Sequence, residues 1–135
     1  MTKGNARARR VLVVDDQPDT TAVLTVLFTL LGYETRSALR GREAIRLARD
    51  FDPELILLDI GLPDLNGYEV IQALRADSSP RARYIAAITG RGKVEDRERA
   101  SRAGFDQYLV KPVDLATLRR LLQQVGERAK PPSPN

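Results

Sequence analysis

The residues Leu55-Ile-Leu-Leu58 form a continuous apolar run that Asp59 follows directly. A second run, Val11-Leu-Val-Val14, is followed by Asp15 and Asp16. Continuous rather than alternating apolarity is typical of strands that are buried on both faces, as in a parallel sheet covered by helices. These two runs therefore predict the α/β fold class.

Further apolar runs occur at residues 84–88 and 108–110, and the more polar segment 33–38 is expected to be a strand at the edge of the sheet. Amphipathic stretches separate the runs, which gives five βα units. Strict βα alternation predicts a parallel sheet with right-handed crossovers. Five units are too few for an eight-fold barrel. We expect a five-stranded, doubly wound, flavodoxin-like sheet of order 2-1-3-4-5, with its ligand crevice between the first and third strands.

The first helix has the clearest apolar pattern. Positions i, i+3, i+4, i+7 and i+8 are occupied by Val23, Val26, Leu27, Leu30 and Leu31. This spacing predicts an apolar stripe that faces the core. Asp114 is the expected N-cap of the last helix.

Composition limits the chemistry that the chain can perform. The chain has 135 residues, of which 42% are apolar, and this fits one domain. It contains no cysteine and no histidine. Disulfides, thiolate and imidazole metal sites and histidine bases are therefore excluded. Catalysis or binding would depend on carboxylates, hydroxyls, lysines and backbone groups.

We divide the chain into a basic N-terminal extension (residues 1–9), one folded domain (10–128) and a proline-rich tail (129–135) that we expect to be disordered. Asp15 and Asp16 interrupt the apolar run that a signal peptide would need. No run approaches the ~20 residues that span a bilayer, so we expect a cytoplasmic protein without membrane contact. The net charge is +4, but basic and acidic residues are mixed along the helices, so we expect no direct binding of nucleic acid.

Three carboxylates are expected to meet at one edge of the sheet. If the first and third strands are neighbours, their axes lie roughly 4.8 Å apart, which brings Asp15, Asp16 and Asp59 together. Mutual repulsion makes this arrangement unfavourable unless a cation is present. Because all the ligands are oxygens, the cation should be a hard one, and Mg²⁺ is the expected cofactor.

Thr89 and Lys111 follow the fourth and fifth strands and add a hydroxyl and an ammonium to the same edge. Metal, hydroxyl and lysine around one carboxylate suit phosphoryl transfer, with the carboxylate as nucleophile. Each residue alone has an ordinary structural explanation, such as capping a helix or ending a strand. Their joint placement at the same ends of four strands favours a functional site.

Four motifs resemble those of response regulator receiver domains, and in particular the single-domain, chemotaxis-regulator-like members of two-component signalling. They are Val11-Leu-Val-Val-Asp-Asp16, Leu57-Leu-Asp-Ile-Gly-Leu-Pro-Asp-Leu-Asn-Gly67, Ile88-Thr-Gly90 and Tyr108-Leu-Val-Lys-Pro112. The resemblance covers residues 10–125. It implies that Asp59 is a phosphoacceptor served by a histidine kinase or a histidine phosphotransfer protein.

The resemblance also implies roles for the residues around Asp59. Asp16 would bind Mg²⁺ directly, Asp15 would act largely through water, and Gly61 would offer its backbone carbonyl. The residues that would shape the loops are Pro63, Gly67 and Pro112, with a cis peptide bond between Lys111 and Pro112.

A switch is implied as well. Phosphorylation adds about −1.5 to −2 charges at this edge. Thr89 and Lys111 would be drawn toward the phosphoryl group, and Tyr108 would change rotamer. This would bias a surface on the fourth helix, the fifth strand and the fifth helix toward a downstream protein partner. The chain is thus expected to be a signalling phosphoacceptor rather than an enzyme.

Several alternatives stay open. The chain could be free-standing or a receiver module of a hybrid sensor histidine kinase, and a phosphorylation-independent scaffold could have the same fold. A haloacid-dehalogenase-type phosphatase would need an Asp-x-Asp pattern on the first strand, whereas Asp15 and Asp16 are adjacent. A flavodoxin-type cofactor binder would need a hydroxyl- and glycine-rich phosphate loop, whereas Asp15-Asp-Gln-Pro-Asp19 is acidic.

Overall fold

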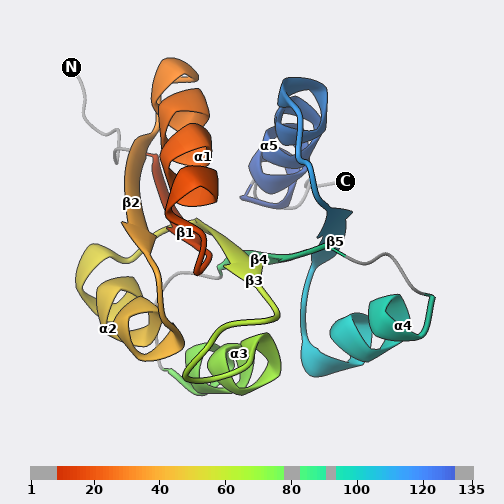
Figure 1. The fold of residues 1–135 in the computed structure, drawn as a ribbon. Helices are drawn as coiled ribbons and strands as arrows, with labels where there is room; N and C mark the ends of the chain where they lie inside the picture. The colour runs from red at the N-terminus through yellow and green to blue at the C-terminus, as the bar shows by residue number, and fades with distance from the viewer. Residues whose placement is uncertain (1–8, 78–82, 91–93, 130–135) are drawn as a thin grey trace, which may run out of the picture.

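The computed structural model describes residues 9–77, 83–90 and 94–129, and within them it contains a five-stranded parallel sheet of order β2-β1-β3-β4-β5 (Figure 1). The strands are β1 (Arg10–Val14), β2 (Glu34–Ala38), β3 (Leu55–Asp59), β4 (Tyr84–Thr89) and β5 (Gln107–Val110). The helices are α1 (Pro18–Leu30), α2 (Gly41–Phe51), α3 (Gly67–Ala76), α4 (Val94–Ala103) and α5 (Leu115–Ala129). The predicted fold class and strand order are confirmed, and the polar strand β2 lies at an edge.

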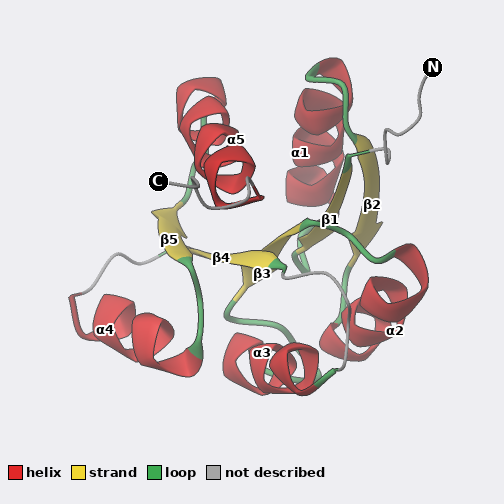
Figure 2. Ribbon diagram, turned by 180° about the vertical axis from the view of Figure 1, so that it is seen from behind, coloured by secondary structure: helices red, strands yellow, loops and turns green. Residues whose placement is uncertain are grey.

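Helices cover both faces of the sheet. Helices α1 and α5 lie on one face, and α2, α3 and α4 lie on the other (Figures 1 and 2). Neighbouring residues of each strand point to opposite faces: Leu12 and Ile56 pack toward α2–α4, whereas Val13 and Leu57 pack toward α1 and α5. All four side chains are fully buried. Burial on both faces explains why the strands are continuously apolar.

The predicted apolar stripe of α1 is only partly confirmed: Leu27 and Leu31 pack against the core, but the other three of its five residues do not. The residues of α1 that are buried are Thr21, Leu24 and Phe28. The side chains of Val23, Val26 and Leu30 are instead 58%, 57% and 76% exposed. Helix α1 carries apolar residues around much of its circumference, so their spacing did not identify the side that touches the sheet. The side of α1 that is buried is therefore decided by how the helix packs on the sheet and not by the most apolar stripe of its sequence.

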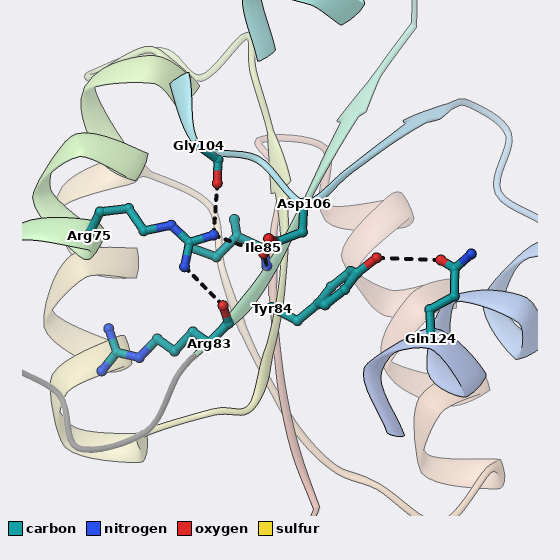
Figure 3. Close-up of polar contacts among 7 residues, drawn as sticks. All are labelled: Arg75, Arg83, Tyr84, Ile85, Gly104, Asp106 and Gln124. Carbon is teal, nitrogen blue, oxygen red and sulfur yellow. Dashed lines mark hydrogen bonds and ion pairs between the residues drawn. The ribbon is translucent and has the colours of Figure 1, made fainter. Parts of the chain in front are cut away.

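The end of the sheet opposite the strand carboxyl termini is held by Arg75 of α3 (Figure 3). Its guanidinium donates to the carbonyls of Arg83 (2.9 Å) and Gly104 (2.7 Å) and to Oδ2 of Asp106 (2.8 Å). The same Oδ2 accepts the backbone N–H of Ile85 at 2.8 Å. One arginine therefore joins α3, the start of β4 and the turn that leads into β5.

The helix ends and termini complete the fold. Asp114 is confirmed as an N-cap, since its Oδ1 accepts the backbone N–H of Thr117 at 2.8 Å. Helix α5 ends at Ala129, where the predicted tail begins, and the predictions for residues 1–8 and 130–135 lie outside the described residues. Among the helices that the structure describes, none combines the length and the apolar character needed to cross a membrane.

The assignment of the buried face of α1 can be tested by making the same substitution, Leu→Ala, on each side of the helix. Leu24 is 3% exposed and Leu30 is 76% exposed. We expect Leu24→Ala to lower the free energy of unfolding by about 2–5 kcal/mol, because it leaves a cavity in the core. Leu30→Ala should change it by less than about 0.5 kcal/mol. Chemical denaturation measures both, and equal losses would contradict the assignment of the buried face.

Candidate functional site

The carboxyl ends of β1 and β3 bring three aspartates together. Asp59 is the last residue of β3, and Asp15 and Asp16 follow β1, whose Val14 is paired with Leu58. One carboxylate oxygen from each aspartate lies within 4.8 Å of those of the other two. Asp15 is fully buried and Asp59 is 7% exposed, whereas Asp16 is exposed. The predicted convergence of the three carboxylates is therefore present.

Lys111 supplies the cation at this cluster. Its Nζ lies 2.7 Å from Oδ2 of Asp15 and 3.3 Å from Oδ2 of Asp59. Partial burial acts to lower the pKa of Lys111, but the two carboxylates outweigh this effect and raise that pKa above its ordinary value. The lysine is therefore a stable ammonium that partly offsets the negative charge of the site.

The carboxyl group of Asp59 lies in surroundings that disfavour its ionised form. Its Oδ1 accepts the backbone N–H of Gly61 at 2.9 Å. Burial raises the pKa of Asp59, and the neighbouring charge of Asp15 acts in the same direction. The Gly61 N–H and Lys111 act in the opposite direction without cancelling the rise. The ionised form of Asp59 would therefore gain from a further cation.

The donor set fits a hard metal ion. Oδ1 of Asp15 accepts the backbone N–H of Gln17 at 2.9 Å. Its Oδ2 is buried and accepts no hydrogen bond of good geometry in the described structure, although Lys111 lies within ion-pair distance. A buried carboxylate oxygen with spare lone pairs, beside two further carboxylates, matches the oxygen ligands that Mg²⁺ prefers.

The remaining predicted residues surround this cluster. Thr89 ends β4, and its carbonyl accepts the backbone N–H of Lys111 at 2.8 Å, which aligns the ends of β4 and β5. Tyr108 lies half-buried in β5, and the guanidinium carbon of Arg97 is 5.4 Å from the centre of its ring. Their switch roles stay predictions. The peptide bond between Lys111 and Pro112 is cis.

The loop after β3 passes close to the start of α3. Gly67 donates its N–H to the carbonyl of Ile60 at 2.7 Å, and a Cβ on Gly67 would lie only 2.6 Å from the Cα of Ile60. A larger residue does not fit at this position without a shift of the backbone. Pro63 lies exposed in the same loop, and the carbonyl of Gly61 stays a predicted metal ligand.

Sequence reasoning missed two features beside the site. One is Asp64, whose carboxylate accepts the backbone N–H groups of Gly41 and Arg42 at 2.7 and 3.0 Å. The absence of a capping side chain before α2, where Arg40 stands, is the signal that could have revealed it. The other is an apolar groove of about 570 Å³ that extends from Lys111 to Val23 on the exposed side of α1. No sequence pattern separates such a groove from the core.

Comparisons with known proteins agree with this geometry. The family model of the response regulator receiver domain matches residues 11–123. The transcriptional regulatory protein PrrA of Mycobacterium tuberculosis is 41% identical over 124 residues, which cover 89% of this chain and 52% of PrrA. This chain spans about half the length of PrrA and of several other curated relatives that it matches.

Solved structures show the same fold. The chemotaxis protein CheY4 of Vibrio cholerae has a TM-score of 0.82 and 29% identity, and the match covers 88% of this chain and 99% of CheY4. The receiver domain of the sensor histidine kinase PA1611 of Pseudomonas aeruginosa, solved with a magnesium ion coordinated in its active site cleft, has a TM-score of 0.80 and 34% identity over 89% of this chain and 99% of that domain. The family match, the strand order and the acidic cluster at the sheet edge together show that the chain belongs to the response regulator receiver domains of two-component signalling.

Proposed function

We propose that the domain accepts a phosphoryl group on Asp59 from a histidine kinase or a histidine phosphotransfer protein, in a reaction that requires Mg²⁺. The observation that carries the proposal is the contact of Lys111 with two buried carboxylates, one of which is Asp59. A purely structural ion pair would need one carboxylate for one ammonium. The excess of negative charge here suits a site that binds a metal ion, which would also offset the charge of an incoming phosphoryl group.

The chemistry follows from the groups present. A carboxylate oxygen of Asp59 attacks the phosphorus, the P–N bond of a phosphohistidine breaks, and its electron pair stays on the imidazole nitrogen. Lys111 lies close enough to Asp59 to offset charge on the transferred oxygens, and the hydroxyl of Thr89 would donate a hydrogen bond to one of them. Asp15, Asp16, Asp59 and the Gly61 carbonyl would hold Mg²⁺, which when bound neutralises charge on the phosphoryl oxygens.

The output surface proposed here is formed by α4, β5 and α5. A groove of about 240 Å³ between α4 and β5 is lined in part by Arg97, Phe105 and Tyr108. A phosphoryl group that draws Thr89 and Lys111 inward would disturb β4 and β5 and change the position of Tyr108 relative to this groove. A downstream protein would then bind one arrangement more tightly than the other.

The phosphodonor protein is proposed to approach over α1. The groove beside Lys111 continues along the exposed side chains of Val23 and Val26. Exposed apolar surface next to a charged site is typical of a protein interface. A donor that packs on α1 would bring its phosphohistidine to the open side of the acidic cluster.

The alternatives differ in their partners rather than in their chemistry. A receiver module of a hybrid sensor histidine kinase would use the same residues with a donor in its own chain. A phosphorylation-independent scaffold would keep the fold and not need the carboxylate of Asp59. For either form we propose a cytoplasmic location and protein partners, without direct contact between this domain and nucleic acid.

Phosphorylation can be tested by the intact mass of the protein after incubation with acetyl phosphate and Mg²⁺. We expect the wild type to gain one phosphoryl group and Asp59→Asn to gain none, because the nucleophile is lost. Asp19→Asn is the matched control, since Asp19 is an exposed carboxylate near the site but outside the cluster. Chelation of the metal should suppress the gain. A folded wild type that stays unmodified would favour the scaffold alternative.

The raised pKa of Asp59 predicts a dependence of stability on pH. The folded state binds this proton more tightly than the unfolded state, whose carboxyl has an ordinary pKa of 3.8. The stabilisation by this group is therefore full below pH 3.8 and is lost as the pH rises through the folded-state pKa. Without Mg²⁺, Asp59→Asn should be more stable than the wild type at pH 7, with a smaller advantage at pH 4. Denaturation curves at both pH values measure this, and a wild type at least as stable as the variant at pH 7 would contradict it.

Docking on α1 can be separated from the chemistry of the site. The double variant Val26→Ala and Leu30→Ala should accept phosphoryl groups from acetyl phosphate at the wild-type rate. Transfer from a phosphorylated histidine phosphotransfer protein should slow by about tenfold or more, because apolar anchors of an interface are removed. Leu39→Ala, an exposed leucine outside α1, is the control. Equal transfer rates for all three proteins would exclude α1 as the docking surface.

A further inference from the structure

Helix α2 begins without a capping side chain of its own. The N-cap position is Arg40, whose side chain makes no capping hydrogen bond. The first N–H groups of a helix have no partner within the helix and need an acceptor from elsewhere. Asp64, in the loop between β3 and α3, supplies it: Oδ1 accepts the N–H of Gly41 at 2.7 Å and Oδ2 accepts that of Arg42 at 3.0 Å. One carboxylate thus caps a helix that lies more than twenty residues before it in the chain.

The contact between the loop and α2 is closely packed. A Cβ on Gly41 would lie 2.8 Å from Cγ2 of Val70 and 3.0 Å from Cβ of Leu65. Glycine is therefore needed for α2 to approach the loop and α3 at this distance. Because residue 41 has no side chain, the backbone N–H groups of Gly41 and Arg42 come close enough to donate directly to Asp64.

The same loop carries groups of the phosphorylation site. Gly61 donates its N–H to Asp59, and its carbonyl is the proposed metal ligand. The far end of the loop is held by Asn66, whose side chain accepts the N–H of Glu69 at 2.9 Å in a capping box that starts α3. Asp64 lies between these two points and ties the middle of the loop to α2.

The carboxylate of Asp64 keeps its charge through the physiological range. Desolvation acts to raise its pKa, but the N–H groups of Arg42, Gly41 and Leu65 outweigh that effect and lower the pKa to about 2. The cap is therefore charge-assisted, and hydrogen bonds of this kind are stronger than those between neutral groups. It also places a negative charge at the positive end of the α2 dipole.

We propose that Asp64 is a positioning residue for the phosphorylation site: by capping α2 it holds the loop 60–66 in place, and with it the carbonyl of Gly61 among the metal ligands. This inference rests on the proposed function, because it assumes that Asp59 and its neighbours bind Mg²⁺. Asp64 touches neither Asp59 nor Lys111 in the contacts described for it, so it acts through the loop backbone.

The test compares Asp64→Ala with a control that removes a similar link. Asp77 follows α3 and accepts a hydrogen bond from Nε of Arg49, in α2, at 3.2 Å. It connects α3 to α2 near their carboxyl ends, away from the site. Asp77→Ala therefore removes another carboxylate that contacts α2, without touching the loop 60–66. Asp64→Asn, which keeps one carbonyl acceptor, is the conservative variant.

Two measurements are needed, and neither reports the stability of the folded protein. The first is the Kd for Mg²⁺, obtained by following the amide resonance of Gly61 during titration with MgCl₂. The second is the Mg²⁺ concentration that gives half of the maximal phosphorylation rate with acetyl phosphate. We expect Asp64→Ala to raise both by about tenfold, the lower end of the effect of losing a group that orients a metal ligand. The maximal rate at saturating Mg²⁺ should stay within about twofold, Asp64→Asn should be intermediate, and Asp77→Ala should match the wild type.

The outcomes separate this inference from the proposed function. If Asp64→Ala binds Mg²⁺ as tightly as Asp77→Ala and the wild type, Asp64 is only a helix cap and the inference is overturned. If the wild type binds Mg²⁺ but is not phosphorylated, the proposed function fails, while the ratio of the Kd values still decides the role of Asp64. If Asp64→Ala does not fold, the Kd of Asp64→Asn relative to the wild type decides, with an increase supporting the inference and equality overturning it.

Discussion

Repulsion between the buried carboxylates of Asp15 and Asp59 is the interaction on which the rest of this structure depends. Two like charges are brought together at the carboxyl edge of the sheet, where burial raises the pKa of Asp59. Lys111 offsets part of the cost through contacts of 2.7 and 3.3 Å. Such a site persists only when the surrounding fold is stable enough to impose it. The function proposed for the domain uses this imbalance, since a bound metal ion would balance the charge of the carboxylates and of the transferred phosphoryl group.

The fold around the site is held by specific contacts at both ends of the strands. Continuously apolar strands, buried on both faces, hold the register that aligns Asp59 with its neighbours. At the far end Arg75 ties α3 to β4 and to the turn before β5 (Figure 3). Near the site Gly67 permits the close approach of the start of α3 to Ile60, and Asp64 links the loop 60–66 to α2. Polar contacts outside the cluster thus limit how far its groups can move.

The surfaces on the two sides of the sheet differ in character. Helix α1 presents the exposed apolar side chains of Val23, Val26 and Leu30, and Val23 lines the groove beside Lys111. Helix α4, on the other face, presents arginines, two of which lie over the rings of Tyr68 and Tyr108. An apolar surface suits a donor protein that must exclude water during transfer. A charged and aromatic surface suits a partner that binds reversibly when the electrostatics of the edge change.

The sequence alone determined the fold class, the strand order and the meeting of Asp15, Asp59 and Lys111, because these depend on local patterns: buried strands are apolar throughout, and residues that follow parallel strands share one edge. It did not determine which side of α1 is buried, since apolar residues such as Leu30 occur around most of that helix and only contact with the sheet separates the core from the surface. Nor did it reveal Asp64, because the missing cap at Arg40 indicates that α2 needs an acceptor from elsewhere but does not identify which distant residue supplies it. Tertiary structure decided both, since packing and hydrogen bonding between remote segments depend on where the chain places them in space.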